Sequence, residues 1–259
     1  MAIFIGGYAR TGTTLMQAIL CSNPSTFPFT KESIYLYSLV YSYIEGRQLW
    51  NLHVDDYFDS LEDYVNFNKN IIAEYIYHIK DRWGWDKEII QKSPLMTTIF
   101  PELSYLMNGI EPAKFIVMLR DPRDTIASMK SIYIRLNKKT TTEELLTEYK
   151  KRDEPIMKNK NSFDDHLIFI NYEKLILENK KYMQKLRNFT NLSLNNDLSG
   201  WTGEEYNHDA YQSSLWGKPI SRDSIGSYKK ILDNSEVKYI ESYKNCMNDF
   251  FCMNIFLAD

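Results

Sequence analysis

The chain has 259 residues and a formal net charge of −3, with 31 basic and 34 acidic side chains. This length suits an α/β domain with a full core, and no Pro/Gly/Ser-rich linker or repeat interrupts the sequence, so we expect one domain over residues 1–259. The net charge argues against a nucleic-acid binder that works through a broad basic face. The three cysteines (Cys21, Cys246 and Cys252) lack the spacing of a zinc site, and their odd number disfavours a disulfide framework.

The N-terminus leads directly into an apolar segment, without the charged and long apolar regions of a secretory signal. No stretch approaches the roughly 20 apolar residues that a membrane-spanning helix needs. We therefore expect a protein without a membrane span that is located in the cytoplasm, although removal of an N-terminal anchor would leave the same sequence.

Residues 2–20 predict a short buried strand, a glycine-bounded loop that contains Arg10, and a helix that begins with Thr13 and Thr14. Three glycines let the loop backbone approach an anion closely. Free amides and the helix dipole favour negative charge at the start of the helix, and the hydroxyls and the guanidinium add donors. No acidic residue precedes Glu32. The segment therefore predicts a phosphate-binding loop.

This loop differs from the usual nucleoside-triphosphate loop in the position of its cation. Gly7 and Gly12 have the G-x-x-x-x-G spacing, but Thr13 stands where that loop carries its lysine. With Arg10 inside the loop, residues 8–15 (Tyr-Ala-Arg-Thr-Gly-Thr-Thr-Leu) instead resemble the 5′-phosphosulfate loop of the sulfotransferases that use 3′-phosphoadenosine-5′-phosphosulfate (PAPS). The residue sequence of this loop is more similar to that of the carbohydrate, tyrosylprotein and bacterial branch than to that of the cytosolic small-molecule branch. The resemblance implies a P-loop-type central parallel sheet flanked by helices, and it implies donor binding by Arg10, Thr11, Gly12, Thr13 and Thr14.

Pro24 ends the first helix, because proline removes a backbone donor and restricts the residue before it. The loop that follows delivers Glu32. Apolar residues then recur at helical spacing over residues 36–44 and again over residues 61–79. These patterns predict two amphipathic helices whose apolar faces pack in the core.

The run Glu88–Gln91 predicts a short strand that ends at Lys92. Residues that face a ligand lie at the carboxyl ends of strands in doubly wound sheets. Lys92 is therefore a candidate site residue.

Residues 113–119 form a nearly continuous apolar run, which predicts a central parallel strand covered on both faces. The segment at 119–129 (Leu-Arg-Asp-Pro-Arg-Asp-Thr-Ile-Ala-Ser-Met) closely resembles the 3′-phosphate element of the sulfotransferases, and we expect a helix over residues 125–136. The resemblance implies that Arg120 and Ser128 hold the 3′-phosphate.

A guanidinium at a strand end and a hydroxyl on the next helix can bind one phosphate from two sides. The alternative is structural: Arg120 forms a surface ion pair with Asp121 or Asp124.

The polar region after residue 137 contains the pattern Thr141-x-x-Glu144, which predicts a helix capping box. Residues 167–170 predict another apolar strand. The segment at 171–175 that follows resembles the family's Tyr-Glu-x-Leu element, which implies that Tyr172 lies beside the nucleotide.

The C-terminal loop at 216–230 is similar to the loop that closes over the nucleotide in carbohydrate and tyrosylprotein sulfotransferases. This similarity implies phosphate contacts from Ser224, Lys229 and Lys230. A last helix is expected to cover the core with Val237, Ile240, Met247, Phe250 and Phe251.

Sulfuryl transfer to a hydroxyl needs positive charge at the reacting oxygens and a base that takes the acceptor proton. Arg10 and Lys92 can supply the charge. The histidine that serves as base in the cytosolic branch is absent, since Pro94 occupies its position. In the other branch a glutamate after the first helix is the base, which implies this role for Glu32. Alternatively, Glu32 is only an acid that stabilises a helix start. None of the four histidines lies in a matching motif or has metal spacing (His53, His78, His166 and His208).

The leading hypothesis is a sulfotransferase that uses PAPS, releases adenosine 3′,5′-bisphosphate and needs no metal. The acceptor is a hydroxyl of a sugar, a peptide tyrosine or a small phenol, and the oligomeric state is open. One alternative is a kinase-like P-loop enzyme, which the missing loop lysine and the lack of a magnesium-binding acid at a strand end disfavour. A third hypothesis is a protein that binds adenosine bisphosphate without turnover.

Overall fold

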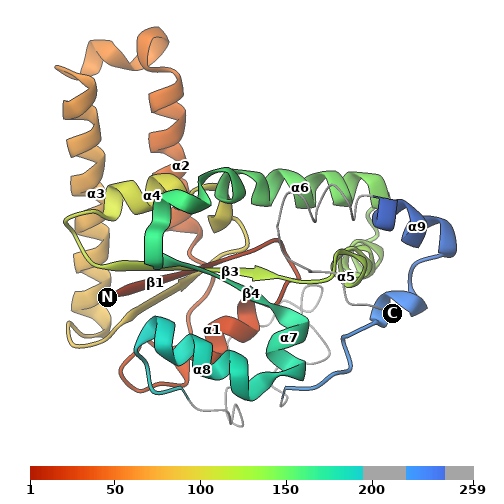
Figure 1. Cartoon of the computed structure of the whole chain (residues 1–259). Coiled ribbons are helices and arrows are strands. Elements are labelled where there is room, and N and C mark those ends of the chain that lie inside the picture. Colours follow the sequence, from red (N-terminus) through yellow and green to blue (C-terminus); the bar gives the residue numbers. More distant parts are fainter. Residues whose placement is uncertain (195–219, 243–259) are drawn as a thin grey trace.

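The computed structural model describes residues 1–194 and 220–242, and these residues include a four-stranded parallel sheet (Figure 1). The strands are β1 (Ala2–Gly6), β2 (Ile89–Lys92), β3 (Ala113–Leu119) and β4 (Leu167–Asn171), and their order across the sheet is β2-β1-β3-β4. Strands β1 and β2 are buried throughout, as expected for strands covered on both faces, although β2 includes the polar residues Gln91 and Lys92. The predicted α/β class with a central parallel sheet is confirmed.

The register of the sheet places the predicted site segments at one edge. Ile5 pairs with Lys92, and Gly6 pairs with Val117, so the loop after β1 lies beside the ends of β2 and β3. Leu119 in turn pairs with Asn171 at the end of β4. Because all four strands are parallel, the residues that follow them emerge at the same carboxyl edge.

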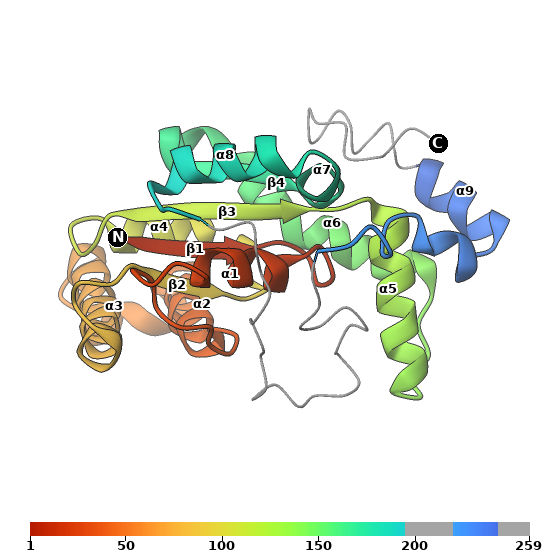
Figure 2. The ribbon, with the colours of Figure 1, turned by 90° about the horizontal axis from the view of Figure 1, so that it is seen from below.

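One face of the sheet is covered by α1 (Thr13–Cys21), α7 (Tyr172–Leu177) and α8 (Asn179–Thr190) (Figures 1 and 2). Their buried side chains pack on those of the strands that point to this face. This cluster includes Ile3, Ile5, Met16, Ile19, Leu20, Ile116, Met118, Ile170, Leu175, Met183 and Leu186. Burial of this apolar surface anchors α1, and with it the loop that precedes α1.

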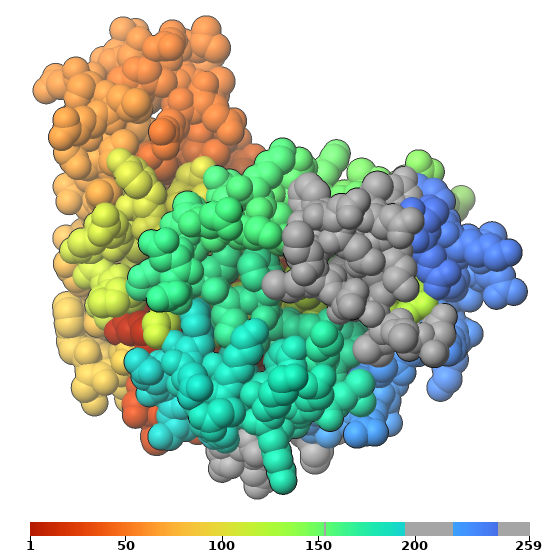
Figure 3. All heavy atoms as spheres, viewed as in Figure 1, coloured from red at the N-terminus to blue at the C-terminus, as the bar shows by residue number. Residues whose placement is uncertain are grey.

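The opposite face carries a larger cluster, to which five further helices contribute. They are α2 (Ile34–Gln48), α3 (Leu61–Trp83), α4 (Phe100–Met107), α5 (Pro122–Arg135) and α6 (Thr142–Asn159). The short helix α9 (Asn234–Ser242) adds Ile240 to this cluster. Helices α2 and α3 form a hairpin that projects beyond the sheet (Figures 1 and 3).

Short helical turns connect these elements. A π-helical turn (Trp50–Val54) and a 3₁₀ turn (Asp55–Tyr57) join α2 to α3. Further 3₁₀ turns cover Met96–Thr98, Lys160–His166 and Ser227–Lys230. In the described residues no helix is both long and apolar enough to cross a bilayer.

The predicted elements are present, with shifted ends. Helix α5 begins at Pro122 rather than at Thr125, because the Asp121 carboxylate accepts a hydrogen bond from the Arg123 amide (2.8 Å) and proline fits the first helical position. Strand β2 includes Lys92 as its last residue.

The predicted capping box at the start of α6 is confirmed. The Thr141 hydroxyl accepts from the Glu144 amide, and the Glu144 carboxylate accepts from the Thr141 amide. Parts of two other predictions lie outside the described residues: the loop segment 216–219, and the positions of Met247, Phe250 and Phe251. That residues 1–259 form one domain stays a prediction.

Candidate active site

The loop between β1 and α1 has a constrained backbone. Arg10 has φ 74° and Gly12 has φ 97°, both in the left-handed region. A Cβ atom at Gly12 would lie 2.5 Å from the Tyr172 ring, so glycine is required there. The Thr11 hydroxyl donates to the Tyr8 carbonyl (2.7 Å) and thereby shapes the loop from within. Its predicted contact with the donor stays a prediction.

The start of α1 is suited to an anion. Its N-cap, Gly12, provides no side-chain hydrogen bond, and its first turn contains no acidic residue. Thr13 is buried and Thr14 is half-buried at this start. Because the first amides of a helix have no partner within the helix, the amides here and the helix dipole favour bound negative charge.

Arg10 connects the two predicted phosphate elements. Its Nε donates to Ser128 Oγ on α5 (3.0 Å), and its carbonyl accepts from Arg120 Nη1 (2.9 Å). Burial and the nearby Arg120 and Arg135 guanidinium groups lower the pKa of Arg10 to about 10. Three guanidinium groups therefore lie close together, and their positive charge favours a bound anion.

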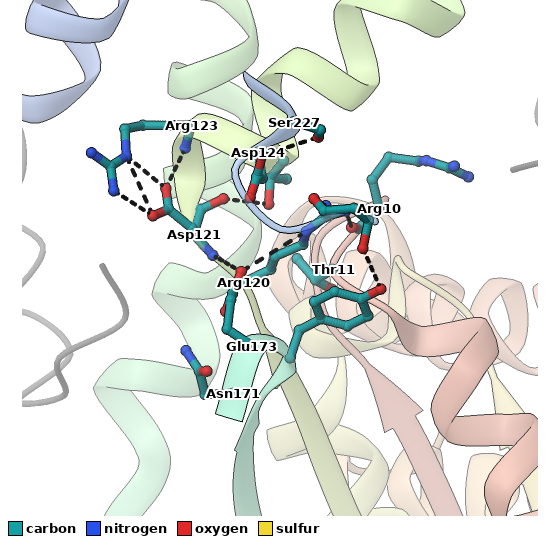
Figure 4. A network of polar contacts seen from close by, with 12 residues as sticks. Arg10, Thr11, Arg120, Asp121, Arg123, Asp124, Asn171, Glu173 and Ser227 are labelled. Carbon is teal, nitrogen blue, oxygen red and sulfur yellow. Dashed lines mark hydrogen bonds and ion pairs between the residues drawn. The ribbon is translucent and has the colours of Figure 1, made fainter. Parts of the chain in front are cut away.

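Arg120 lies at the centre of this network, between Arg10 and Glu173 (Figure 4). It is only 6% exposed; its Nη2 donates to the Ser224 carbonyl (2.7 Å), and its guanidinium lies over the Tyr172 ring at 4.8 Å. Its buried Nε has no hydrogen-bond partner among the described residues. A buried donor of this kind is costly to leave without an acceptor.

The alternative role of Arg120, an ion pair with Asp121 or Asp124, is wrong in this structure. Arg123 instead forms the ion pair with Asp121, with 2.8 Å between Arg123 Nη2 and Asp121 Oδ2. Arg120 instead has Glu173 as its ionic neighbour, with 3.9 Å between Arg120 Nε and Glu173 Oε1.

Glu173 is a buried acid that sequence reasoning did not select. Its Oε1 accepts from the Asp121 amide (2.9 Å), while its buried Oε2 lacks a partner among residues 1–194 and 220–242. Burial raises the pKa of Glu173 to about 7, against the opposing effects of the Asp121 amide and Arg120. The sequence signal was present in the Tyr-Glu-x-Leu resemblance, from which only the tyrosine was taken.

Asp124 attaches the C-terminal loop to the start of α5 (Figure 4). Sequence reasoning did not select this residue either. Its carboxylate accepts from the Gly226 amide (2.7 Å), Ser227 Oγ (3.0 Å) and the Tyr228 amide (2.9 Å). No local sequence signal indicates these partners, because they lie about one hundred positions later in the chain.

Among the predicted contacts of this loop, the structure brings only Ser224 into the network. Ser224 Oγ lies 2.7 Å from the Tyr172 hydroxyl. Lys229 and Lys230 are exposed, and the Lys229 ammonium lies 5.8 Å from the centroid of the Tyr228 ring. Their role as phosphate contacts stays a prediction.

The two predicted catalytic residues contact each other. Lys92 Nζ donates to Glu32 Oε1 at 2.9 Å, and the Ser33 amide donates to the Lys92 carbonyl. Lys92 is buried, whereas Glu32 is 39% exposed. Burial lowers the pKa of Lys92 and the nearby Arg10 lowers it further, while Glu32 opposes this shift.

A further contact joins the phosphate-binding loop to α6. The Tyr8 hydroxyl donates to Glu148 Oε2 at 3.3 Å, and the Tyr8 ring packs edge-on against Tyr149. His53, His78 and His166 belong to none of these contacts, and His208 lies outside the described residues. In the described part of the chain, no group of three or more His, Cys, Asp or Glu side chains is arranged to hold a metal.

Comparisons with known proteins identify the family of this chain. The family model described as "Sulfotransferase family" matches residues 2–196. Protein-tyrosine sulfotransferase 1 of Danio rerio is 26% identical over 199 residues, which are 74% of this chain and 54% of the relative. This chain therefore spans about half the length of that relative. A putative protein-tyrosine sulfotransferase of Caenorhabditis briggsae is 26% identical over 95% of this chain and 82% of its own length.

Solved structures share the fold. The sulfotransferase domain of the Synechococcus PCC 7002 olefin synthase has a TM-score of 0.57 and 16% identity, over 94% of each chain. The sulfotransferase domain from the curacin biosynthetic pathway has a TM-score of 0.58 and 16% identity, over 94% of this chain and 96% of that one.

Proposed function

The chain belongs to the sulfotransferase family of enzymes, and we propose that it moves a sulfuryl group from PAPS to an acceptor hydroxyl. The observation that carries this proposal is the joining of two cationic phosphate elements at the carboxyl edge of the sheet: Arg10 in the first loop contacts both Arg120 and Ser128. Lys92, the last residue of the neighbouring strand β2, pairs with Glu32 at the same edge.

The residues present fit the donor. The buried Nε of Arg120 lacks an acceptor among the described residues, and the Ser128 hydroxyl lies beside Arg10, so this end suits the 3′-phosphate. The first turn of α1, with Thr13 and Thr14, suits the 5′-phosphosulfate. Tyr172 directly follows β4, and its hydroxyl contacts Ser224 of the C-terminal loop. These two residues suit contact with the nucleoside.

PAPS supplies an activated sulfur–oxygen bond, which breaks as the acceptor oxygen bonds to sulfur, and its electron pair stays on the phosphate oxygen. We assign to Glu32 the role of the base that accepts the proton of the acceptor hydroxyl, since its carboxylate is partly exposed beside Lys92. Lys92 and the first-turn amides of α1 stabilise the negative charge that develops on the phosphate oxygen. The ion pair between Lys92 and Glu32 holds both groups at the same place.

The direct test is incubation of the purified chain with PAPS and representatives of three acceptor classes: a sugar, a tyrosine peptide and a phenol. We expect an added sulfuryl group by mass spectrometry on at least one class, in the presence of a metal chelator. Phosphorylation from ATP and magnesium, without sulfation, would favour the kinase hypothesis. Tight binding of adenosine 3′,5′-bisphosphate without any product would favour the hypothesis of a binding protein without turnover.

The cytoplasmic location stays a prediction, which fractionation of the native cells tests.

A further inference from the structure

A cavity of about 280 Å³ lies beside the proposed transfer site, on the side of α5 and α6. Tyr8 and Ala9, which directly precede Arg10, form part of its wall. Pro94 and Leu95, which follow Lys92 by two and three positions, form another part. The cavity therefore borders the two segments that carry Arg10 and Lys92, through residues next to them in the chain rather than through these two side chains.

The walls of this cavity are mainly apolar. Helix α5 and its C-cap residue contribute Met129, Ile132, Tyr133 and Leu136, and Leu95 also lines the space. A sugar bound here would place several hydroxyl groups against side chains that cannot form hydrogen bonds, and burying an unpaired hydroxyl is unfavourable. A flat, hydrocarbon-rich body avoids this cost. The aromatic rings of Tyr8 and Tyr133 can also pack on such a body.

The polar groups of the cavity carry more positive than negative charge. Its charged lining residues are Lys138, Glu148 and Arg152. The Glu148 carboxylate already accepts a hydrogen bond from the Tyr8 hydroxyl. The two cations can therefore favour an anionic group on the ligand over a cationic one.

We propose that this cavity is the acceptor site and that it selects a phenolic hydroxyl on a ring-sized body, with preference for an anionic substituent. This proposal rests on the sulfotransferase function proposed above. The phenolic oxygen forms the new bond to sulfur, its proton goes to Glu32, and adenosine 3′,5′-bisphosphate leaves with the electron pair. A free phenol and the tyrosine side chain of a peptide offer the same chemistry, so the experiment separates these two sources.

The first arm compares acceptors by kcat/KM in the presence of PAPS. The probes are phenol, 4-hydroxybenzoate, tyramine, methyl glucoside and a short peptide with one tyrosine. We expect transfer to the phenols well above transfer to methyl glucoside, and 4-hydroxybenzoate above tyramine. If activity on the peptide is comparable to activity on the free phenols, the acceptor is the tyrosine side chain of a peptide. If only the free phenols are sulfated, the acceptor is a small molecule. A preference for methyl glucoside would overturn the proposal.

The second arm fills the cavity. Leu136→Trp should reduce kcat/KM for phenols at least tenfold, because the larger indole fills part of the cavity volume that the acceptor ring would occupy. Ile134→Trp is the matched control, since Ile134 is 67% exposed and does not line the cavity. Both variants should keep the thermal shift given by adenosine 3′,5′-bisphosphate, which reports a folded donor site. Unchanged phenol turnover in Leu136→Trp would overturn the proposal.

The third arm tests the charge preference. Arg152→Gln should lower the ratio of 4-hydroxybenzoate to tyramine turnover by about two- to fivefold, the size expected for a partly exposed charge pair. The exposed neighbour Lys139, which does not line the cavity, provides the control Lys139→Gln. An unchanged ratio in Arg152→Gln would refute the role of Arg152. If the parent chain neither binds adenosine bisphosphate nor sulfates any probe, the proposed function itself fails, and this inference with it.

Discussion

The two ends of the candidate site are built differently. At the Arg120 end, three segments are tied together by hydrogen bonds: Arg120 holds the carbonyls of Arg10 and Ser224, and Asp124 holds three groups of the C-terminal loop. At the Lys92 end, one ion pair stands beside a largely apolar cavity. The donor is the same in every turnover, so a preorganised site lowers the cost of binding it. In the function proposed here, the acceptor end determines selectivity through shape and apolar contact.

The largest effect should come from the Lys92 end. Glu32→Gln keeps the size of the side chain but cannot take the acceptor proton, so turnover should fall by about 100- to 10,000-fold. The dissociation constant for adenosine 3′,5′-bisphosphate should stay near that of the parent, because the Arg120 end is untouched. Steady-state kinetics with a confirmed acceptor, together with calorimetric titration, measure the two quantities.

Glu45→Gln on the exposed surface of α2 is the control for this change and should behave like the parent. Turnover by Glu32→Gln within a fewfold of the parent would leave Glu32 as a partner of Lys92 only. The expected loss should also be smaller for a phenol than for an alcohol, since a phenol is acidic near pH 10.

A smaller, selective effect should come from the Arg120 end. Arg120→Ala should weaken binding of adenosine 3′,5′-bisphosphate by about 1.5–3 kcal/mol, or roughly tenfold to a hundredfold, through loss of a charge-assisted contact. Binding of adenosine 5′-phosphate, which lacks the 3′-phosphate, should change much less. Equal losses for both ligands would show that Arg120 acts on the fold rather than on the 3′-phosphate.

The same end should make stability depend on pH. The pKa of Glu173 is raised from its ordinary 4.5 to about 7 in the folded chain, so the folded state holds a proton that the unfolded state has lost. The contribution of Glu173 to the free energy of unfolding should therefore be most favourable below pH 4.5. It should decline as the pH rises through 7, by on the order of 1–3 kcal/mol.

Glu173→Gln should remove most of this decline, and the exposed Glu143→Gln should leave it in place. Urea unfolding at pH 5 and pH 8 measures the difference. The same slope in Glu173→Gln and in the parent would mean that another group titrates.

The smallest effect should come from the attachment of the C-terminal loop. Asp124→Asn replaces one acceptor oxygen with a donor, so we expect a loss of about 0.5–1.5 kcal/mol in adenosine bisphosphate binding and faster exchange of the Gly226 and Tyr228 amides. Asp223→Asn, an exposed position on the same loop, is the matched control. Hydrogen exchange that is unchanged in Asp124→Asn would mean that the loop is held by other contacts.

The sequence predicted much of this architecture because its signals are local. The strand-loop-helix at residues 2–20 and the apolar run at 113–119 carry their own periodicity and turn chemistry. The capping box at Thr141 is likewise complete within four positions. These elements could be placed without knowing the tertiary structure.

Contacts between distant segments could not be predicted in this way. Whether Arg120 would pair with Asp121 or with Glu173 depended on Arg123, whose side chain turns back to Asp121 once α5 begins at Pro122. The partners of Asp124 and the cavity between α5 and α6 exist only after the chain has folded. Lys92 and Glu32 are 60 residues apart: the end of a predicted strand indicated Lys92, and a family resemblance indicated Glu32, but neither signal predicted their contact.

The central claim is that the joined cations around Arg10 and Arg120 bind an adenosine 3′,5′-bisphosphate nucleotide. Thermal unfolding with a metal chelator and with this nucleotide at about one hundred times its dissociation constant tests it most directly. We expect stabilisation by about 2.7 kcal/mol, and only a weak effect of ATP with or without magnesium. A larger stabilisation by ATP with magnesium, or none by adenosine 3′,5′-bisphosphate, would contradict it.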